Sequence, residues 1–96
     1  MSIGLLTLEV HLPYAHSLKE KRMVVQRMKD RLRGRFNVAV AELDHQDTWQ
    51  RLLLGVVSVS SSEENLRQVL DAALRESERI LMDGGHSLVH STIELL

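Results

Sequence analysis

The order of its hydrophobic patterns restricts the fold of this 96-residue chain more than any other feature. Four segments have the apolar patterns of β-strands, namely residues 3–12, 36–43, 49–60 and 87–95. Two longer segments repeat apolar residues every three or four positions, as amphipathic helices do, and these are residues 18–33 and 62–82. The chain is therefore predicted to run strand, helix, strand, strand, helix, strand.

The first helix is bounded by residues that start and stop helices. Pro13 cannot continue the ladder of the preceding strand. Ser17 and Glu20 then form a capping box, in which each side chain satisfies a free backbone N–H of the first turn. Gly34 is the predicted end of this helix, because glycine leaves the helical conformation easily.

The second helix has the most regular pattern in the chain. Ser61 and Glu64 repeat the capping signal, and the sequence Asp83-Gly84-Gly85 interrupts the helix before the last strand. Its predicted apolar stripe consists of Leu66, Val69, Leu70, Ala73, Leu74, Ser77, Ile80 and Leu81.

This order of elements is the split βαβ pattern of the ferredoxin-like fold, an α+β architecture. Right-handed crossovers place both helices on one face of a four-stranded antiparallel sheet. The first and third strands, which are the most apolar, are then central. We expect residues 1–96 to form one domain, since a chain of this length folds without disulfides or metals.

The face of the sheet without helices is predicted to be unusually apolar. Strand alternation assigns to it Ile3, Leu5, Ala39, Ala41, Leu43 and Leu88, among Thr7, Glu9, His11 and His90. Such a patch favours association, so one hypothesis is a homodimer, or a scaffold for a small ligand, with Leu5 and Leu88 in the interface. Trp49, at the base of the predicted hairpin, either covers an edge of the core or contacts a partner.

Charge is distributed very unevenly along the chain. Eight of the 12 lysine and arginine residues lie between positions 19 and 35, which gives that segment a net charge of about +6 and leaves about −7 for the rest. The eight are Lys19, Lys21, Arg22, Arg27, Lys29, Arg31, Arg33 and Arg35. Such a block attracts phosphates or acidic protein surfaces, because local potential steers encounter more than net charge does.

Two structural explanations compete with phosphate binding. A charged run is often simply the solvated face of a helix. Moreover, the second helix is acidic, so attraction between the two helices would use up positive charge within the molecule. Its acidic residues are Glu63, Glu64, Asp71, Glu76, Glu78 and Asp83.

Several classes of function lack the residues that they require. The chain has no cysteine, which excludes disulfides, thiolate catalysis and cysteine-ligated metals. The aromatic residues are Tyr14, Phe36 and Trp49, which are not placed to stack RNA bases on the two central strands. The apolar start, residues 1–8, is too short for a signal peptide or a membrane span, and we expect a cytoplasmic protein.

The histidines are candidate metal ligands. His86, His90 and Glu94 fall on one side of the last strand, but positions four apart on a strand are separated by about 13 Å, too far for a single ion unless His11 or Glu9 joins from the neighbouring strand. A polar outer face on a half-solvated sheet explains the same residues. No nucleophile has a base fixed beside it, and the serines at 60–62 are explained by helix capping. We therefore expect no catalytic site, no metal and no cofactor.

Three short motifs resemble the YlxP-like family of small bacterial proteins, and the similarity runs along essentially the whole chain. They are residues 16–22 (HSLKEKR), 35–42 (RFNVAVAE) and 47–50 (DTWQ). The resemblance implies a ferredoxin-like fold. In many genomes, genes of this family lie near those for a translation initiation factor and a ribosome-binding factor, which implies work on RNA or the ribosome. It supplies no catalytic residue, and Ser17, Leu18, Lys19, Lys21 and Arg22 are only a family signature.

The first helix is therefore the predicted functional surface. We expect a non-enzymatic protein that docks on RNA or a ribosomal subunit through this helix and its N-terminal turn, and that recognises phosphate and shape rather than bases. The residues assigned to this surface are Ser17, Lys19, Lys21, Arg22, Arg27, Lys29, Arg31, Arg33 and Arg35.

Overall fold

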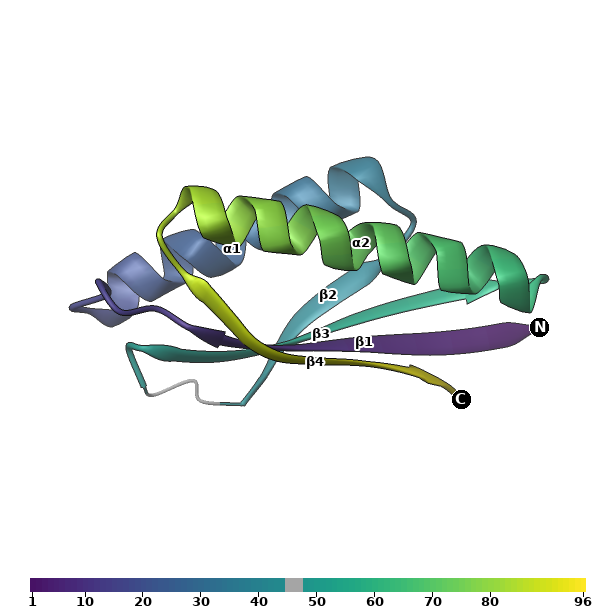
Figure 1. Cartoon of the computed structure of the whole chain (residues 1–96), viewed down its shortest axis with the longest axis horizontal. Coiled ribbons are helices and arrows are strands. Elements are labelled where there is room, and N and C mark those ends of the chain that lie inside the picture. Colours follow the sequence, from purple (N-terminus) through teal and green to yellow (C-terminus); the bar gives the residue numbers. More distant parts are fainter. Residues whose placement is uncertain (45–47) are drawn as a thin grey trace.

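The computed structural model describes residues 1–44 and 48–96, and these contain the predicted elements in the predicted order (Figure 1). The elements are β1 (Ser2–His11), α1 (Leu18–Arg35), β2 (Ala39–Asp44), β3 (Arg51–Ser60), α2 (Glu63–Asp83) and β4 (Ser87–Leu95). Residues 45–47 lie outside the described part, and with them the first residue of the 47–50 motif.

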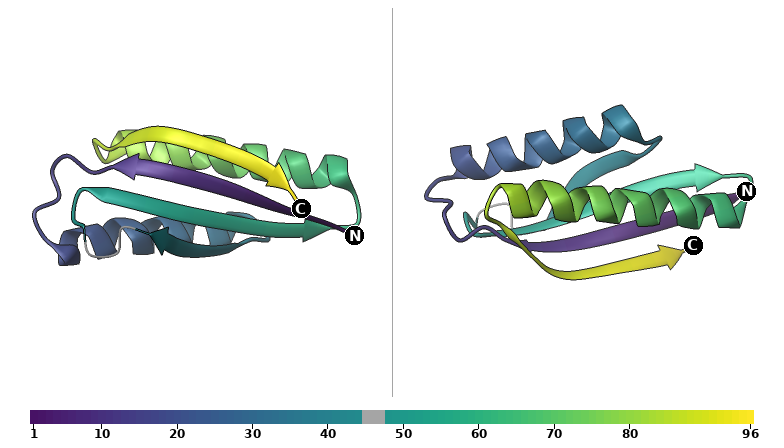
Figure 2. Two further views of the ribbon diagram at one scale, coloured as in Figure 1. Left: turned by 90° about the horizontal axis from the view of Figure 1, so that it is seen from below. Right: turned by 45° about the horizontal axis from the view of Figure 1, so that its top comes forward.

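The sheet has the strand order β2-β3-β1-β4, and all its pairings are antiparallel. Both helices lie on one face, side by side and antiparallel, while the opposite face is left bare by the described residues (Figures 1 and 2). The predicted ferredoxin-like α+β fold is confirmed, with β1 and β3 in the centre. These strands are central because they have the longest apolar runs, which a central strand buries.

The core lies between the sheet and the helices, and strand alternation selects its residues. In β1 the side chains of Leu6, Leu8 and Val10 are buried. Their partners across the β1–β3 ladder, Val56, Leu54 and Leu52, are buried with them. α2 contacts β1, β3 and β4, whereas α1 contacts α2 and the edge strand β2. Helix α1 therefore lies along one side of the molecule, with a flank that faces away from α2.

The helix ends follow the predicted chemistry with two shifts of one or two residues. Ser17 caps α1 as predicted, and its Oγ accepts a hydrogen bond from the Glu20 N–H at 3.1 Å. The helix passes through Gly34 and ends at Arg35, so the predicted stop at Gly34 was wrong. The cap of α2 is Ser62, one residue after the predicted Ser61. Both shifts are within the variation that local signals leave open at helix ends.

The end of α2 is a Schellman motif, which explains the predicted break at the glycines. The His86 N–H donates to the Leu81 carbonyl at 2.8 Å, and the Gly85 N–H donates to the Met82 carbonyl at 3.0 Å. Gly85 has a φ of 77°, in the left-handed region that glycine adopts without strain.

Leu88 does not lie on the open face, contrary to the prediction. The β1–β4 ladder has an irregularity between Glu9 and Val10, so that His90 pairs with Glu9 but Leu88 pairs with Val10. Because an inserted residue reverses the side-chain alternation, Leu88 turns to the helix side and packs partly buried against the core. The bulge thus removes Leu88 from the predicted interface.

Candidate nucleic-acid interface

The structure separates the nine residues assigned to the α1 surface into distinct environments. Most of the cations are exposed, namely Lys19, Arg22, Arg27, Arg31, Arg33 and Arg35, and Lys29 is half-buried. Ser17 acts as the helix cap described above. Lys21 is buried, with only 2% of its surface exposed.

Lys21 belongs to the interior and not to the predicted binding surface. Its position on α1 falls on the same face as Val25 and Met28, which point into the core. The ammonium Nζ lies 2.8 Å from Glu42 Oε2 of β2 and donates to the Thr48 carbonyl at 2.8 Å. A charge at this depth is stable only because it is paired and hydrogen-bonded. Lys21 therefore ties α1 to β2 and to the segment that precedes β3.

The N-terminal turn of α1 supplies its own anion. The carboxylate of Glu20 accepts a hydrogen bond from the His16 N–H at 2.8 Å, and the Ser17 hydroxyl accepts one from the Glu20 N–H. The capping box thus occupies the position at which a phosphate would meet the helix N-terminus. The cations further along α1 remain as the candidate phosphate contacts.

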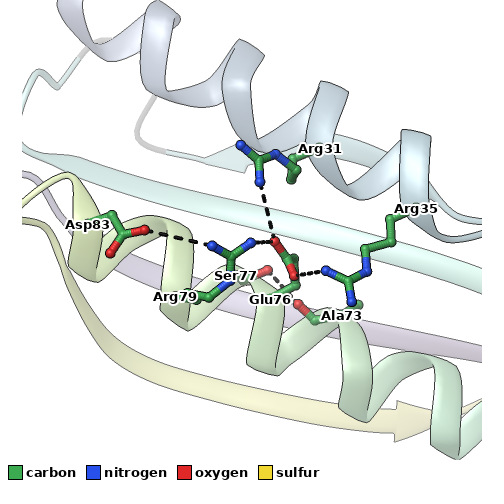
Figure 3. Close-up of polar contacts among 7 residues, drawn as sticks. All are labelled: Arg31, Arg35, Ala73, Glu76, Ser77, Arg79 and Asp83. Carbon is green, nitrogen blue, oxygen red and sulfur yellow. Dashed lines mark hydrogen bonds and ion pairs between the residues drawn. The ribbon is translucent and has the colours of Figure 1, made fainter.

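On the flank of α1 that faces α2, a single carboxylate gathers three arginines (Figure 3). Glu76 Oε2 lies 2.5 Å from Arg35 Nη1, and Glu76 Oε1 lies 3.7 Å from Arg31 Nη1. Arg79 of α2 also pairs with Glu76 and reaches Asp83 at 3.8 Å. The Glu76 side chain is 5% exposed, whereas the arginines remain about half exposed. The predicted attraction between the helices therefore exists, and it engages Arg31 and Arg35.

The opposite flank of α1 carries a row of polar residues that we call the outer stripe. Its members are Lys19, Arg22, Gln26, Lys29 and Arg33. They follow one another at intervals of three and four residues, which aligns them along one side of a helix. Arg33 lies between Arg31 and Arg35 in sequence but donates instead to the Val40 carbonyl of β2 at 3.4 Å, which places the stripe on the β2 side.

The outer stripe keeps its positive charge. Among residues 1–44 and 48–96, none of its four cations forms an ion pair. It spans about 14 residues of helix, or about 21 Å, a length over which one strand of a B-form duplex carries about six phosphates. The basic segment is visible in the sequence. Which flank of it can contact a phosphate is seen only in the structure, where Arg31 and Arg35 pair with Glu76 and the outer stripe does not.

The histidine candidates do not converge on a metal site. His86 precedes β4, His90 pairs with Glu9 across the sheet, and Glu9 forms an ion pair with Arg51 at 3.0 Å. Within the described part of the chain, no group of three or more histidine or acidic side chains is arranged to hold an ion. Nor does any described helix have the length and apolar character needed to cross a membrane.

His86 is nevertheless an unusual side chain. A Cβ on Gly84 would lie 2.8 Å from its Cδ2, so the glycine makes room for the ring. Burial, and secondly the positive charge of Arg27, lower the pKa of His86 below 6.5. The unfolded chain therefore binds a proton there more readily than the folded protein does.

We expect the free energy of unfolding to fall as the pH drops below about 6.5, because protonation of His86 favours the unfolded state. A His86→Asn variant should show a shallower pH dependence in urea unfolding measured from neutral to mildly acidic pH. The control places the same new side chain at an exposed residue that does not titrate, as Gln68→Asn, which should leave the slope unchanged. Equal slopes for the wild type and His86→Asn would contradict this assignment.

Two residues of the predicted interface remain near the surface. Leu5 lies on the open face opposite Val57, as predicted. Trp49 is 48% exposed and does not belong to the core cluster. Its side chain thus lies at the surface, two residues before the start of β3.

The comparisons by sequence point to one family. The family model described as "Protein of unknown function (DUF503)" matches residues 3–83. The "Uncharacterized protein YlxP" of Bacillus subtilis (strain 168) is 44% identical over 72 residues, which is 71% of this chain and 78% of that protein.

Solved structures share the fold at low sequence identity. A C-terminal segment of the alpha subunit of aIF2 from Pyrococcus abyssi superimposes with a TM-score of 0.55 and 16% identity. That match covers 97% of this chain, which spans only 48% of the archaeal one. A de novo designed protein with a ferredoxin fold gives a TM-score of 0.56 and 14% identity, over 100% of this chain and 84% of the other. At these identities the likeness shows the fold alone.

Proposed function

Because the chain belongs to the family described as protein of unknown function (DUF503), as its YlxP-like motifs predicted, we propose a function from its surface rather than by inheritance. The protein is a non-enzymatic cytoplasmic factor that associates with RNA, as on a ribosomal subunit, through the outer stripe of α1. The observation that carries this proposal is the row of four cations on one flank of α1, none of which forms an ion pair within residues 1–44 and 48–96.

The geometry of the outer stripe favours phosphate contacts over base recognition. Its cations follow a straight helix edge, and Lys19 and Arg22 are exposed on successive positions of that edge. The residues that stack bases in single-strand binders are absent from the stripe, which contains no aromatic side chain. Association is therefore expected to depend on backbone charge and shape, and only weakly on sequence.

The number of phosphate contacts predicts how steeply RNA affinity falls with salt concentration. If the four cations each neutralise one phosphate of a single strand, the slope of log affinity against log salt is about −3. Affinity then falls about 50-fold between about 50 and about 200 mM salt. A protein whose charge is neutralised internally would show almost no such dependence.

The test is a charge reversal in the outer stripe, Lys19→Glu combined with Arg22→Glu. Both side chains are exposed, and neither forms an ion pair within the described residues, so the fold should be kept. Affinity for a labelled single-stranded RNA, followed by fluorescence anisotropy, is expected to fall at least about tenfold, and the salt slope to about −1.5, because two contacts are lost.

The matched control reverses two exposed arginines of α2, Arg67→Glu with Arg75→Glu, and changes net charge by the same amount. We expect this variant to bind the RNA within about twofold of the wild type at a fixed salt concentration, since distant exposed charges are largely screened. Equal losses in the two variants would mean that net charge, and not the outer stripe, governs binding, and would refute the proposal.

A further inference from the structure

The sheet face opposite the helices presents a continuous aliphatic surface. Ladder register places Val57 beside Leu5 and Val59 beside Ile3, in the two central strands. Val57 is 36% exposed and Val59 is 52% exposed. We call this surface the open apolar face, and its members are Ile3, Leu5, Ala39, Ala41, Leu43, Leu53, Val57 and Val59.

The side chain of Leu43 covers the centre of the open apolar face. A Cβ on Gly55 would lie 2.8 Å from Leu43 Cδ1, so the leucine side chain of β2 lies across the glycine of β3. Leu43 is itself 50% exposed. The space that a small ligand would need above Gly55 is therefore taken, and the face favours a flat apolar partner.

The size of the face matches that of a protein interface. The four strands contain about 35 residues, and each covers about 4.8 Å by about 3.3 Å, so the whole sheet face with its polar border measures about 550 Å². Two such faces in contact bury about 1,100 Å² in total, just above the roughly 1,000 Å² that a specific interface needs. The left view of Figure 2 shows that the strands run uncovered along this whole side.

The aliphatic part of the face lies on β1, β2 and β3, and charged side chains lie at its border. Glu9 and Arg51 pair with each other at 3.0 Å at one end, and the exposed Glu94 of the edge strand β4 lies beside Leu5. A polar border around an apolar centre is the usual composition of a protein interface, and a flat aliphatic area is complementary to a second copy of itself. We infer that the open apolar face binds a second copy of this chain, face to face about a two-fold axis.

This arrangement leaves the helices on the outside. Because α1 and α2 lie on the side away from the open face, a dimer leaves both outer stripes uncovered (Figure 1). The inference does not depend on RNA binding, since it rests on the sheet and the proposed function rests on α1. Failure of one therefore leaves the other standing.

The experiment measures molar mass by light scattering at micromolar to millimolar concentration, with the wild type and a Val57→Lys, Val59→Lys variant. We expect the wild type at twice the monomer mass and the variant with a dissociation constant raised at least about a hundredfold, because each valine is buried twice in a two-fold dimer. The control is Met82→Lys with Val89→Lys, at side chains 77% and 63% exposed on α2 and β4, and it should remain dimeric.

Two results overturn the inference. One is a wild type that stays monomeric at millimolar concentration, and the other is a dimer that survives the two valine substitutions or is lost in the control. Single cysteines give a second measurement in case the lysine variant folds poorly, since the chain has none of its own. Val57→Cys should form a covalent dimer on mild oxidation and Met82→Cys should not; the reverse pattern rejects the face-to-face arrangement.

Discussion

Replacing Lys21 with glutamate is expected to lower the free energy of unfolding by about 4 kcal/mol, because it leaves two like charges in the interior. The new carboxylate would face Glu42, and the Thr48 carbonyl would lose its donor. With 2% of Lys21 exposed, water cannot compensate for the lost partners. The measurement is the urea midpoint by far-UV circular dichroism.

The control for Lys21 lies two residues away. Lys19→Glu changes the same charge on the solvent side of α1 and should alter stability by less than about 0.5 kcal/mol. Replacing both partners, Lys21→Met with Glu42→Leu, should recover most of the lost stability, because a buried pair is often exchangeable for apolar residues. A Lys21→Glu protein as stable as Lys19→Glu would show that Lys21 is not buried in solution.

Removal of the Glu76 carboxylate is the second large expected effect. Glu76→Ala should lower the free energy of unfolding by about 2–3 kcal/mol, because a buried acceptor of charged hydrogen bonds is lost and three arginines are left facing one another. The loss should be read from urea unfolding at low salt. Added salt should reduce the difference, since the arginines are half exposed and their repulsion is screened.

RNA binding by the Glu76→Ala variant also shows which of the two flanks of α1 contacts RNA. If RNA binds the outer stripe, Glu76→Ala should leave affinity nearly unchanged. A gain of several-fold would instead assign binding to Arg31, Arg35 and Arg79, the arginines that Glu76 pairs with. Glu78→Ala is the matched control, because Glu78 is an exposed carboxylate on the same helix. A Glu76→Ala protein no less stable than Glu78→Ala would contradict the structural role of the cluster.

Local signals in the sequence were sufficient for the elements and their order. Period-two and helical patterns placed all six, and the capping box at Ser17 and Glu20 fixed the start of α1. The central position of β1 and β3 followed from the ferredoxin-like arrangement, and their apolar sequences agree with it. These features depend on residues close together in the chain, which is why a single sequence reveals them.

The errors arose where a distant residue decides the environment. The spacing of Lys21 from Val25 and Met28 already puts it on the core face of α1, but only Glu42, on a different element, shows how a buried ammonium is paired there. Leu88 keeps the alternation of a regular strand, and only its pairing with β1 reveals the bulge that turns it inward. Nothing in the spacing of the α2 acids distinguishes Glu76 from Glu78, although only Glu76 collects the arginines.

Docking on the ribosome can be measured by sedimentation of the native protein in a cell-lysate gradient at low and at raised salt. We expect co-migration with a ribosomal subunit at about 50 mM salt, and loss of most of that association at about 200 mM, since phosphate contacts weaken steeply with salt. The Lys19→Glu, Arg22→Glu protein should stay at the top of the gradient in both. Wild-type protein that also stays at the top at low salt would contradict the claim that the outer stripe docks on ribosomal RNA.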